Sequence, residues 1–236
     1  MLKLSIAGLI VGVDNKYAYT SELCRDYLTD SGEVDLAVSA TADDLKKEAE
    51  GSDRSYSEAY LESIAIYRKI AEKIPEFDGI VFHGAVIALE GKAYAVTAKS
   101  GVGKTTHLSI WLREFGSEVH ILNGDKPILR VINGEVYAAG TPWRGKENFG
   151  ISEMLPLCGI AFLERAEKSS CEPIGISEAL VPFINQIYVP KSESTAPLAL
   201  SVANKIISSV PMLKLRADMS PEAARIAREA FQSISK

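Results

Sequence analysis

The sequence is 236 residues long, 47% of them hydrophobic and 24% charged, which predicts one α/β domain, or a domain with a small addition, around a sizeable core. The formal net charge of −5 and the isoelectric point near 5.4 give no basic surface for a phosphate backbone, so they argue against a nucleic-acid partner. Cys24, Cys158 and Cys171 lack the close spacing of a zinc site and indicate a reducing compartment.

The first apolar stretch, Leu4 to Val13, is about half as long as the roughly twenty residues needed to cross a bilayer. We therefore predict a strand there. Only Lys3 precedes it as a charge, and no convincing cleavage site follows, which argues against a secretory signal. We expect a cytoplasmic protein with no membrane partner.

Residues 41–54 are rich in charge and glycine and are expected to form a surface segment. Ser55 and Glu58 then match the capping-box pattern S-x-x-E, and apolar residues follow at helical spacing, which predicts a helix over 56–73. Pro75 would end it. We place a boundary here, with an N-terminal α/β segment at 1–76, which could be integral to the same domain, and a second unit at 77–236.

From Gly79 onward the pattern changes to short apolar runs. The turn residues Glu90-Gly91-Lys92 and Asn133-Gly134 each predict a hairpin. Between them, apolar residues at helical spacing predict a helix that ends near Phe115. Ser220 and Pro221 mark the start of the last helix. We predict strands at 80–82, 85–89, 93–97, 119–122, 128–132, 135–138 and 159–163, and further helices near 177–187 and 197–210.

The strongest motif is residues 98–105, Ala-Lys-Ser-Gly-Val-Gly-Lys-Thr, named here the phosphate loop. It differs from the phosphate-binding pattern G-x-x-x-x-G-K-[ST] only by Ala98 in the first glycine position, and it lies between a predicted strand and a predicted helix. Its glycines allow backbone amides to face an anion at the helix N-terminus. The alternative is a glycine-rich turn that caps a helix, which the adjoining Gly-Lys-Thr makes the weaker interpretation.

This motif predicts binding of a purine nucleoside triphosphate, with ATP and Mg²⁺ as cofactors. Lys104 would reach the β- and γ-phosphates, and the hydroxyl of Thr105 would bind the metal. The residues expected to hold the nucleotide are Ser100, Gly101, Val102, Gly103, Lys104, Thr105 and Thr106.

Asp125 follows the apolar strand at 119–122. Strand ends converge on the ligand crevice of an open α/β sheet, so this carboxylate could orient Mg²⁺ or accept a proton from an attacking hydroxyl. A plain Asn-Gly-Asp turn is the alternative.

The segment Phe82-His83-Gly84-Ala85-Val86, followed by a hairpin and the phosphate loop, resembles the kinase domain of the HPr kinase/phosphorylase family. That resemblance covers about residues 78–163 and implies an α/β, carboxykinase-like P-loop domain with a mixed sheet, hairpins and flanking helices. Phosphoenolpyruvate carboxykinase shares a similar loop. Small HPr-kinase-like proteins show a second likeness, in residues 123–127 (Asn-Gly-Asp-Lys-Pro) and 140–146 (Gly-Thr-Pro-Trp-Arg-Gly-Lys).

The resemblance implies catalytic roles for His83 near the transferred phosphate, Lys104 as the neutralising cation and Asp125 as base. Gly124 stands where the family has the first acid of a pair, so Asp125 would serve both roles or share them with Glu147, a further metal-ligand candidate. His107 is expected on the helix surface and His120 as a partly exposed strand residue.

Lys126, Arg144 and Lys146 form a cationic group that could clamp an anionic substrate or be a solvated loop. Trp143 could stack on a ligand or anchor its own loop.

The leading hypothesis is a Mg-dependent kinase that phosphorylates a hydroxyl of a peptide or small molecule. A non-catalytic nucleotide-binding module is the second hypothesis, and a carboxykinase-like metabolic enzyme, disfavoured by length, is the third. The family resemblance also implies a homo-oligomer.

Overall fold

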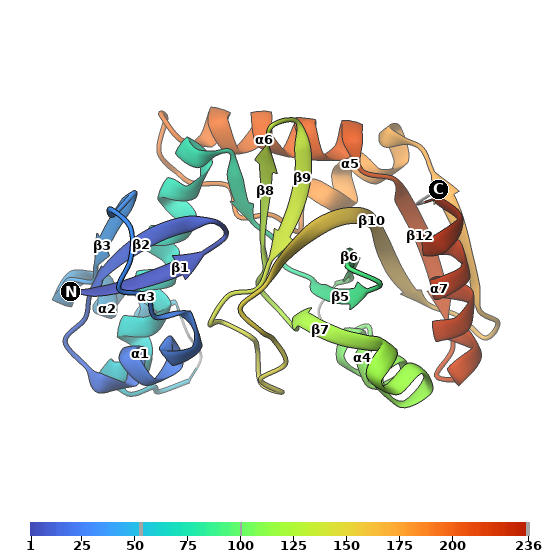
Figure 1. Ribbon diagram of the computed structural model, residues 1–236, viewed down its shortest axis with the longest axis horizontal. Helices are drawn as coiled ribbons and strands as arrows, with labels where there is room; N and C mark the ends of the chain where they lie inside the picture. The colour runs from blue at the N-terminus through green and yellow to red at the C-terminus, as the bar shows by residue number, and fades with distance from the viewer. Residues whose placement is uncertain (52–53, 100, 235–236) are drawn as a thin grey trace.

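The computed structural model describes residues 1–51, 54–99 and 101–234. It shows an α/β architecture with a small N-terminal sheet beside a larger curled mixed sheet with flanking helices (Figure 1). The predicted α/β class with a mixed sheet, hairpins and flanking helices is therefore found. Ser100 of the phosphate loop lies outside the described residues.

The N-terminal sheet has three strands in the order β1-β2-β3. The single strand predicted from Leu4 to Val13 is wrong, because Ala7 and Gly8 turn the chain with φ of 53° and 73° and split it into an antiparallel hairpin. Ala7 carries a Cβ and is seldom found at positive φ, so it gave little turn signal. The strands are β1 (Leu2–Ile6), β2 (Leu9–Asp14) and β3 (Leu36–Ser39).

Helices α1 (Ala18–Leu23), α2 (Ala42–Glu50) and α3 (Glu58–Lys73) accompany this sheet. Within the predicted surface segment at 41–54, residues 42–50 form α2, which has no buried residue. Thr41 and Asp44 form a capping box at the start of this helix. The cap predicted at Ser55 is two residues early: Ser57 precedes α3, and its hydroxyl accepts the amide of Tyr60. Short 3-10 turns follow α1, α3 and α4 at Arg25–Tyr27, Ile74–Phe77 and Gly116–Glu118.

The larger sheet has the path β4-β8-β9-β10-β6-β5-β7, and β12 and β11 continue it beyond β10. Both predicted hairpins, β5–β6 and β8–β9, are present, with positive φ at Glu90 and Gly91 and at Asn133 and Gly134. The strands are β4 (Gly79–Val81), β5 (Ala85–Leu89), β6 (Lys92–Thr97), β7 (Val119–Asn123), β8 (Ile128–Ile132), β9 (Glu135–Ala139), β10 (Met154–Arg165), β11 (Ser170–Ile174) and β12 (Met212–Ala217).

Strand β10 joins the two parts of this sheet. Its first residues pair antiparallel with β9, and its later residues run parallel to β6 and β12. The predicted strand at 159–163 is thus only its second half. The long strand places the end of β6 in the middle of the sheet, where the chain enters the phosphate loop and then α4.

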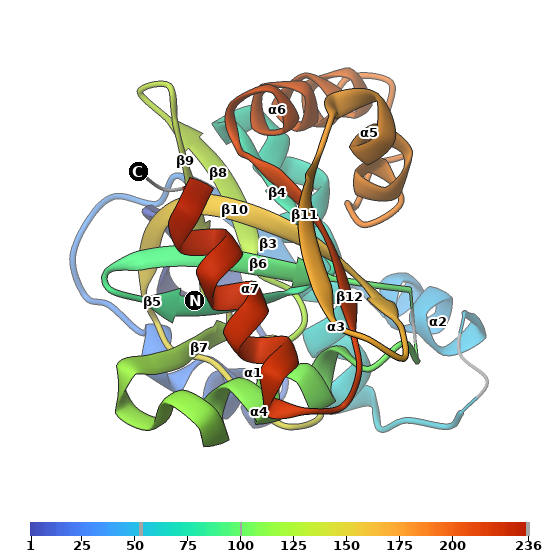
Figure 2. The ribbon, with the colours of Figure 1, turned by 90° about the vertical axis from the view of Figure 1, so that its right-hand side faces the viewer.

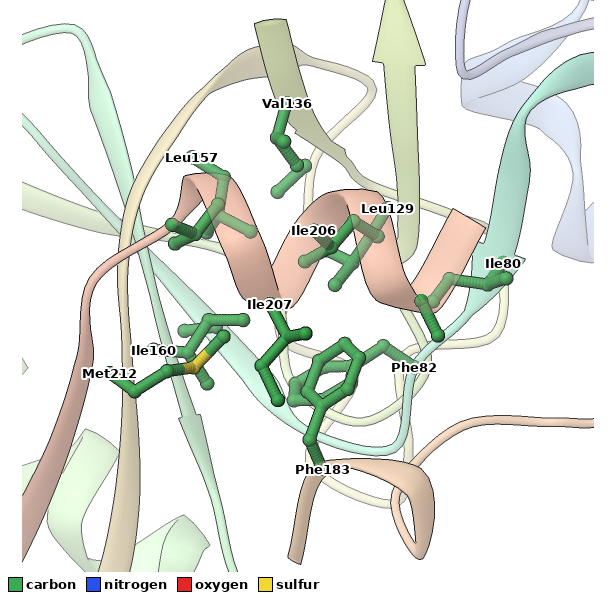
Figure 3. Packing of buried hydrophobic residues seen from close by; sticks show 14 of the residues in the cluster. Ile80, Phe82, Leu129, Val136, Leu157, Ile160, Phe183, Ile206, Ile207 and Met212 are labelled. Atoms are coloured by element: carbon green, nitrogen blue, oxygen red, sulfur yellow. The ribbon is translucent and has the colours of Figure 1, made fainter. Parts of the chain in front are cut away.

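Four helices cover the larger sheet. Helices α4 (Lys104–Phe115) and α7 (Pro221–Ile234) pack on one face through Trp111 and Phe231, and Figure 2 shows α7 crossing β5 and β6. Helices α5 (Ile176–Ile184) and α6 (Ala196–Ser209) pack on the other through residues such as Phe183 and Ile206, as Figure 3 shows.

A third cluster of buried residues joins the N-terminal sheet and α3 to the larger sheet. It includes Ile66 and Ile70 of α3 with Val81, Ile128 and Trp143. The two sheets therefore share a core. Within the described part of the chain, no helix has the length and apolar character to cross a membrane.

Candidate functional site

A cavity of about 880 Å³ lies between the N-terminal helices and the edge of the larger sheet. The sheet side contributes the phosphate loop, the first turn of α4 and the end of β7, and the other side contributes α1, α3 and the loop after β9. Of the predicted site residues, this cavity is lined by His83, Gly101, Gly103, Lys104, Thr105, Thr106, Asp125, Lys126, Arg144, Lys146 and Glu147. Val102 does not line it and packs against the core instead.

The phosphate loop leaves β6 after Thr97 and enters α4 at Lys104, the strand–loop–helix order that the sequence predicts. Gly101 and Gly103 have φ of 79° and 119° and face open space. A side chain at either position would be strained. The first turn of a helix has amides without intrahelical partners, and here they belong to residues at the cavity wall.

Arg165, at the end of β10, lines the cavity and holds the phosphate loop. Its Nε donates to the carbonyl of Val102 at 2.7 Å, and its Nη2 donates to the carbonyl of Gly101 at 2.9 Å. These two bonds fix the carbonyl side of the loop, and within the loop the amide of Val102 donates to the carbonyl of Lys99 at 3.3 Å. Sequence reasoning missed Arg165, because its partners are backbone atoms more than fifty residues away.

Three predicted catalytic side chains meet at one point. His83 Nε2 lies 3.0 Å from Lys104 Nζ and 3.5 Å from Asp125 Oδ1. An ammonium group only donates, so Nε2 of His83 accepts from Lys104, which puts the ring proton on Nδ1. A lysine, a neutral imidazole and a carboxylate thus share the floor of the cavity.

Burial and the nearby Lys104 ammonium lower the pKa of His83, although Asp125 acts in the opposite direction. Burial also lowers the pKa of Lys104, and Asp125 again opposes this. Both shifts share one cause, since a partly desolvated site disfavours positive charge. A negatively charged ligand would supply the compensation that Asp125 alone gives incompletely.

Backbone contacts fix His83. Its amide donates to the carbonyl of Gln186 at 2.6 Å, and its carbonyl accepts the hydroxyl of Thr97 at 2.7 Å. The hydroxyl oxygen of Thr97 also lies 3.1 Å from Gln186 Oε1. The next amide, that of Gly84, donates to the carbonyl of Asp125 at 3.0 Å. The histidine is thus tied to the ends of β6 and β7, and Gln186 gave no sequence signal for this role.

Asn123 sets the position of Asp125. It is fully buried, and its Oδ1 accepts the amides of Asp125 and Lys126 at 2.9 and 2.8 Å. Its Nδ2 donates to the carbonyl and hydroxyl of Thr141 at 3.1 and 3.0 Å. The turn that the sequence offered as an alternative is therefore present, and it also directs Asp125 toward His83.

The loop after β9 is anchored to the N-terminal helices. The ring of Trp143 stacks on Tyr67 with centroids 4.2 Å apart, and its Nε1 donates to the carbonyl of Ser63 at 3.0 Å. Arg144 Nη2 donates to Asp26 at 2.9 Å, with its guanidinium over the ring of Tyr27. Trp143 is thus a loop anchor, and Arg144 already has a carboxylate partner.

The remaining histidines differ in their surroundings. The surface position predicted for His107 is wrong: it is buried, its Nε2 accepts Trp111 Nε1 at 2.9 Å, and burial lowers its pKa to about 4. The prediction failed because His107, one turn after Lys104, lies on the side of α4 that faces the core. His120 is half-exposed, as predicted, and lies 3.0 Å from Glu153.

The donor set at the cavity fits magnesium. Thr105 and Asp125 both line it and offer oxygen ligands, which Mg²⁺ prefers, usually one or two from protein and the rest from phosphate and water. Glu147 also lines the cavity, from the loop after β9 on the other side. No cluster of three or more His, Cys, Asp or Glu side chains suited to a metal occurs among the described residues.

No family model and no curated protein sequence match this chain. Among solved structures, a similar chain is the HPr(Ser) kinase/phosphatase from Coxiella burnetii, with 11% sequence identity and a TM-score of 0.39. The alignment covers 66% of this chain and 99% of that chain. The similarity is distant, concerns the fold, and assigns no residue role here.

Proposed function

We propose that this chain is a Mg-dependent phosphotransferase that moves the γ-phosphate of ATP to a hydroxyl group. The observation that carries the proposal is the meeting of Lys104, His83 and Asp125 within 3.0 and 3.5 Å at the N-terminus of α4. These are a cation, a neutral hydrogen-bonding ring and a carboxylate, in a cavity whose wall is a glycine-rich loop. Phosphoryl transfer requires charge stabilisation and alignment rather than covalent help from the protein.

Triphosphate binding would use the loop amides and Lys104. The helix N-terminus favours negative charge, and Lys104 would contact the terminal phosphates. Thr105 and Asp125 would hold Mg²⁺, which would neutralise charge on the β- and γ-phosphates. The negative charge of the bound phosphates would also raise the pKa values of Lys104 and His83, which burial lowers.

In the transfer step, the acceptor hydroxyl oxygen forms a bond to the γ-phosphorus. The bond between that phosphorus and the β–γ bridging oxygen breaks, ADP leaves, and Asp125 takes the hydroxyl proton. Lys104 stabilises the charge on the moving phosphoryl group. His83, with its ring proton on Nδ1, is held beside the same group by its backbone contacts to Gln186 and Thr97.

One observation favours a binding module without catalysis. Asp125 is the one acid among the three side chains that meet, and at Gly124 a Cβ would lie 3.0 Å from the carbonyl of Arg144 and 3.3 Å from Phe149 Cβ. A second acid would not fit there unless the loop after β9 moved. Turnover with any hydroxyl acceptor separates the two functions.

Titration calorimetry with Mg-ATP and Mg-ADP tests the proposal. We expect Lys104→Ala to weaken ATP binding by about 10–10²-fold, the equivalent of about 1.5–3 kcal/mol for a hydrogen bond to a charged group, and ADP binding by much less. Lys46→Ala, on the exposed face of α2, is the matched control and should change neither affinity. Equal losses for ATP and ADP in Lys104→Ala would contradict contact with the terminal phosphate.

A further inference from the structure

A second cavity, of about 230 Å³, lies on the other side of His83. It shares three lining residues with the large cavity, namely Ile64, His83 and Lys126. One imidazole and one lysine therefore border both spaces. A molecule in the second cavity would face the same groups that face the γ-phosphate in the first.

The walls of this second cavity are mainly apolar. Helix α3 contributes Tyr67 and Ala71, β4 contributes Val81, and the segment after α5 contributes Ile187 and Tyr188. The polar groups at this wall already have partners in part. Tyr67 donates its hydroxyl to the carbonyl of Lys126 at 2.6 Å, and Arg68 pairs with Glu48.

We propose that the second cavity is the acceptor site, and that it takes a small, mainly apolar compound that carries a hydroxyl group. This inference rests on the proposed phosphotransferase function. The hydroxyl would point past His83 and Lys126, which border both cavities, toward the γ-phosphate. Asp125 lines the first cavity with its Oδ1 3.5 Å from His83 Nε2 and would receive the hydroxyl proton there. The bonds made and broken are those of the transfer step above.

The size of the cavity sets the size of the acceptor. An apolar cavity of about 150 Å³ holds a benzene ring, so a space of 230 Å³ has room for a six-membered ring with a short hydroxyl-bearing substituent. It is much smaller than the first cavity, which separates the two sites by ligand size. Nucleotide and acceptor would enter from opposite sides of His83.

The probe for this site is para-fluorobenzyl alcohol, followed by fluorine NMR with the full chain. We expect saturable binding to the unmodified protein, and at least about tenfold weaker binding to Ala71→Leu, because the added side-chain atoms would occupy the cavity. Ala59→Leu, on the same helix and outside both cavities, is the matched control and should bind the probe unchanged. Thermal melting of each variant checks that it folds.

A second variant is needed in case Ala71→Leu does not fold. Tyr188→Ala removes one wall and is expected to weaken probe binding several-fold. The acceptor site is overturned if neither variant that folds affects the probe, or if the unmodified protein does not bind it. It is also overturned if a short serine peptide is phosphorylated without displacing the bound probe from the second cavity.

Mg-ATP binding, measured on the same samples, keeps the two proposals separate. ATP binding without probe binding overturns the acceptor site alone. Probe binding without ATP binding overturns the phosphotransferase function and the acceptor role that rests on it, and leaves the second cavity as a binding site for a small molecule. Lys104→Ala should lose ATP and retain the probe. Mg-ATP should shift the fluorine signal of the bound probe, because the two cavities share His83 and Lys126.

Discussion

The two sides of the large cavity are built by different means. On the sheet side, the phosphate loop and the ends of neighbouring strands bring Lys104, His83 and Asp125 together. On the other side, α3 and the loop after β9 meet through a buried stack of Tyr67 and Trp143. The sheet side holds the groups suited to chemistry, and the helical side gives the cavity its wall. Changes on the sheet side should therefore impair reaction, and changes on the helical side should impair folding first.

The largest effect is expected on the sheet side. Asp125→Asn keeps the size of the side chain and removes its charge, so transfer should fall by about 10²–10⁴-fold, the usual contribution of a general base. Melting temperature should hold, because the contacts of Asn123 are to backbone amides. Initial rates of phosphate transfer are the measurement, with Asp43→Asn on the exposed α2 as control. Unchanged rates would remove Asp125 from the mechanism and direct attention to Glu147.

On the helical side, Trp143→Ala should lower the free energy of unfolding by about 3–5 kcal/mol, the usual cost of truncating a buried tryptophan. Urea denaturation measures this. Trp143→Phe keeps a ring on Tyr67 and loses mainly the bond to Ser63, so it should lose about 1 kcal/mol of stability in addition to any packing change. If Trp143→Ala left the free energy of unfolding unchanged, this residue would not hold the wall of the cavity.

The sheet side could be predicted from sequence to a greater extent than the helical side. The phosphate loop, both hairpins and the strand before Asp125 follow from local patterns of glycine, turn residues and alternation. Strands β3, β11 and β12 and the hairpin at Ala7 were not predicted, since they are short or pair over long distances. Arg165, Asn123 and Gln186 contact backbone atoms, and such contacts have no signature in the sequence.

His107, on the sheet-side helix α4, should make the free energy of unfolding depend on pH. The pKa of His107 in the folded chain, about 4, lies below the unfolded value of about 6.5, so protonation favours unfolding. Its contribution is complete above about pH 6.5 and is lost as pH falls toward 4. By pH 5 the loss is about 2 kcal/mol.

This loss is measurable by urea denaturation at pH 7 and 5. His107→Gln retains an acceptor for Trp111 and cannot take up a proton in this range. Between pH 7 and pH 5 its free energy of unfolding should therefore fall by about 2 kcal/mol less than that of the unmodified protein. His83, whose pKa is also lowered, contributes equally to both. An equal fall in the free energy of unfolding for the two proteins between pH 7 and pH 5 would contradict the buried, neutral state of His107.

The smallest effect concerns the support of the phosphate loop. Arg165→Gln removes two bonds to loop carbonyls, and because Arg165 is exposed we expect Mg-ATP affinity to fall by only about tenfold, or about 1.4 kcal/mol. The control is Arg216→Gln, which changes a partly exposed arginine on β12 that pairs with Glu172. No change in affinity would mean that the loop holds its form without Arg165.

The contacts of Asn123 also bear on how the protein ages. In an Asn-Gly pair the glycine nitrogen can attack the side-chain carbonyl carbon, which leads to deamidation. At Asn123 the amide group makes its hydrogen bonds inside the core, and the nitrogen of Gly124 donates to the carbonyl of Phe149 at 2.9 Å. The same pair at Asn133-Gly134 lies in an exposed hairpin turn. Chemical damage on storage should therefore collect at the turn and spare the residue that positions Asp125.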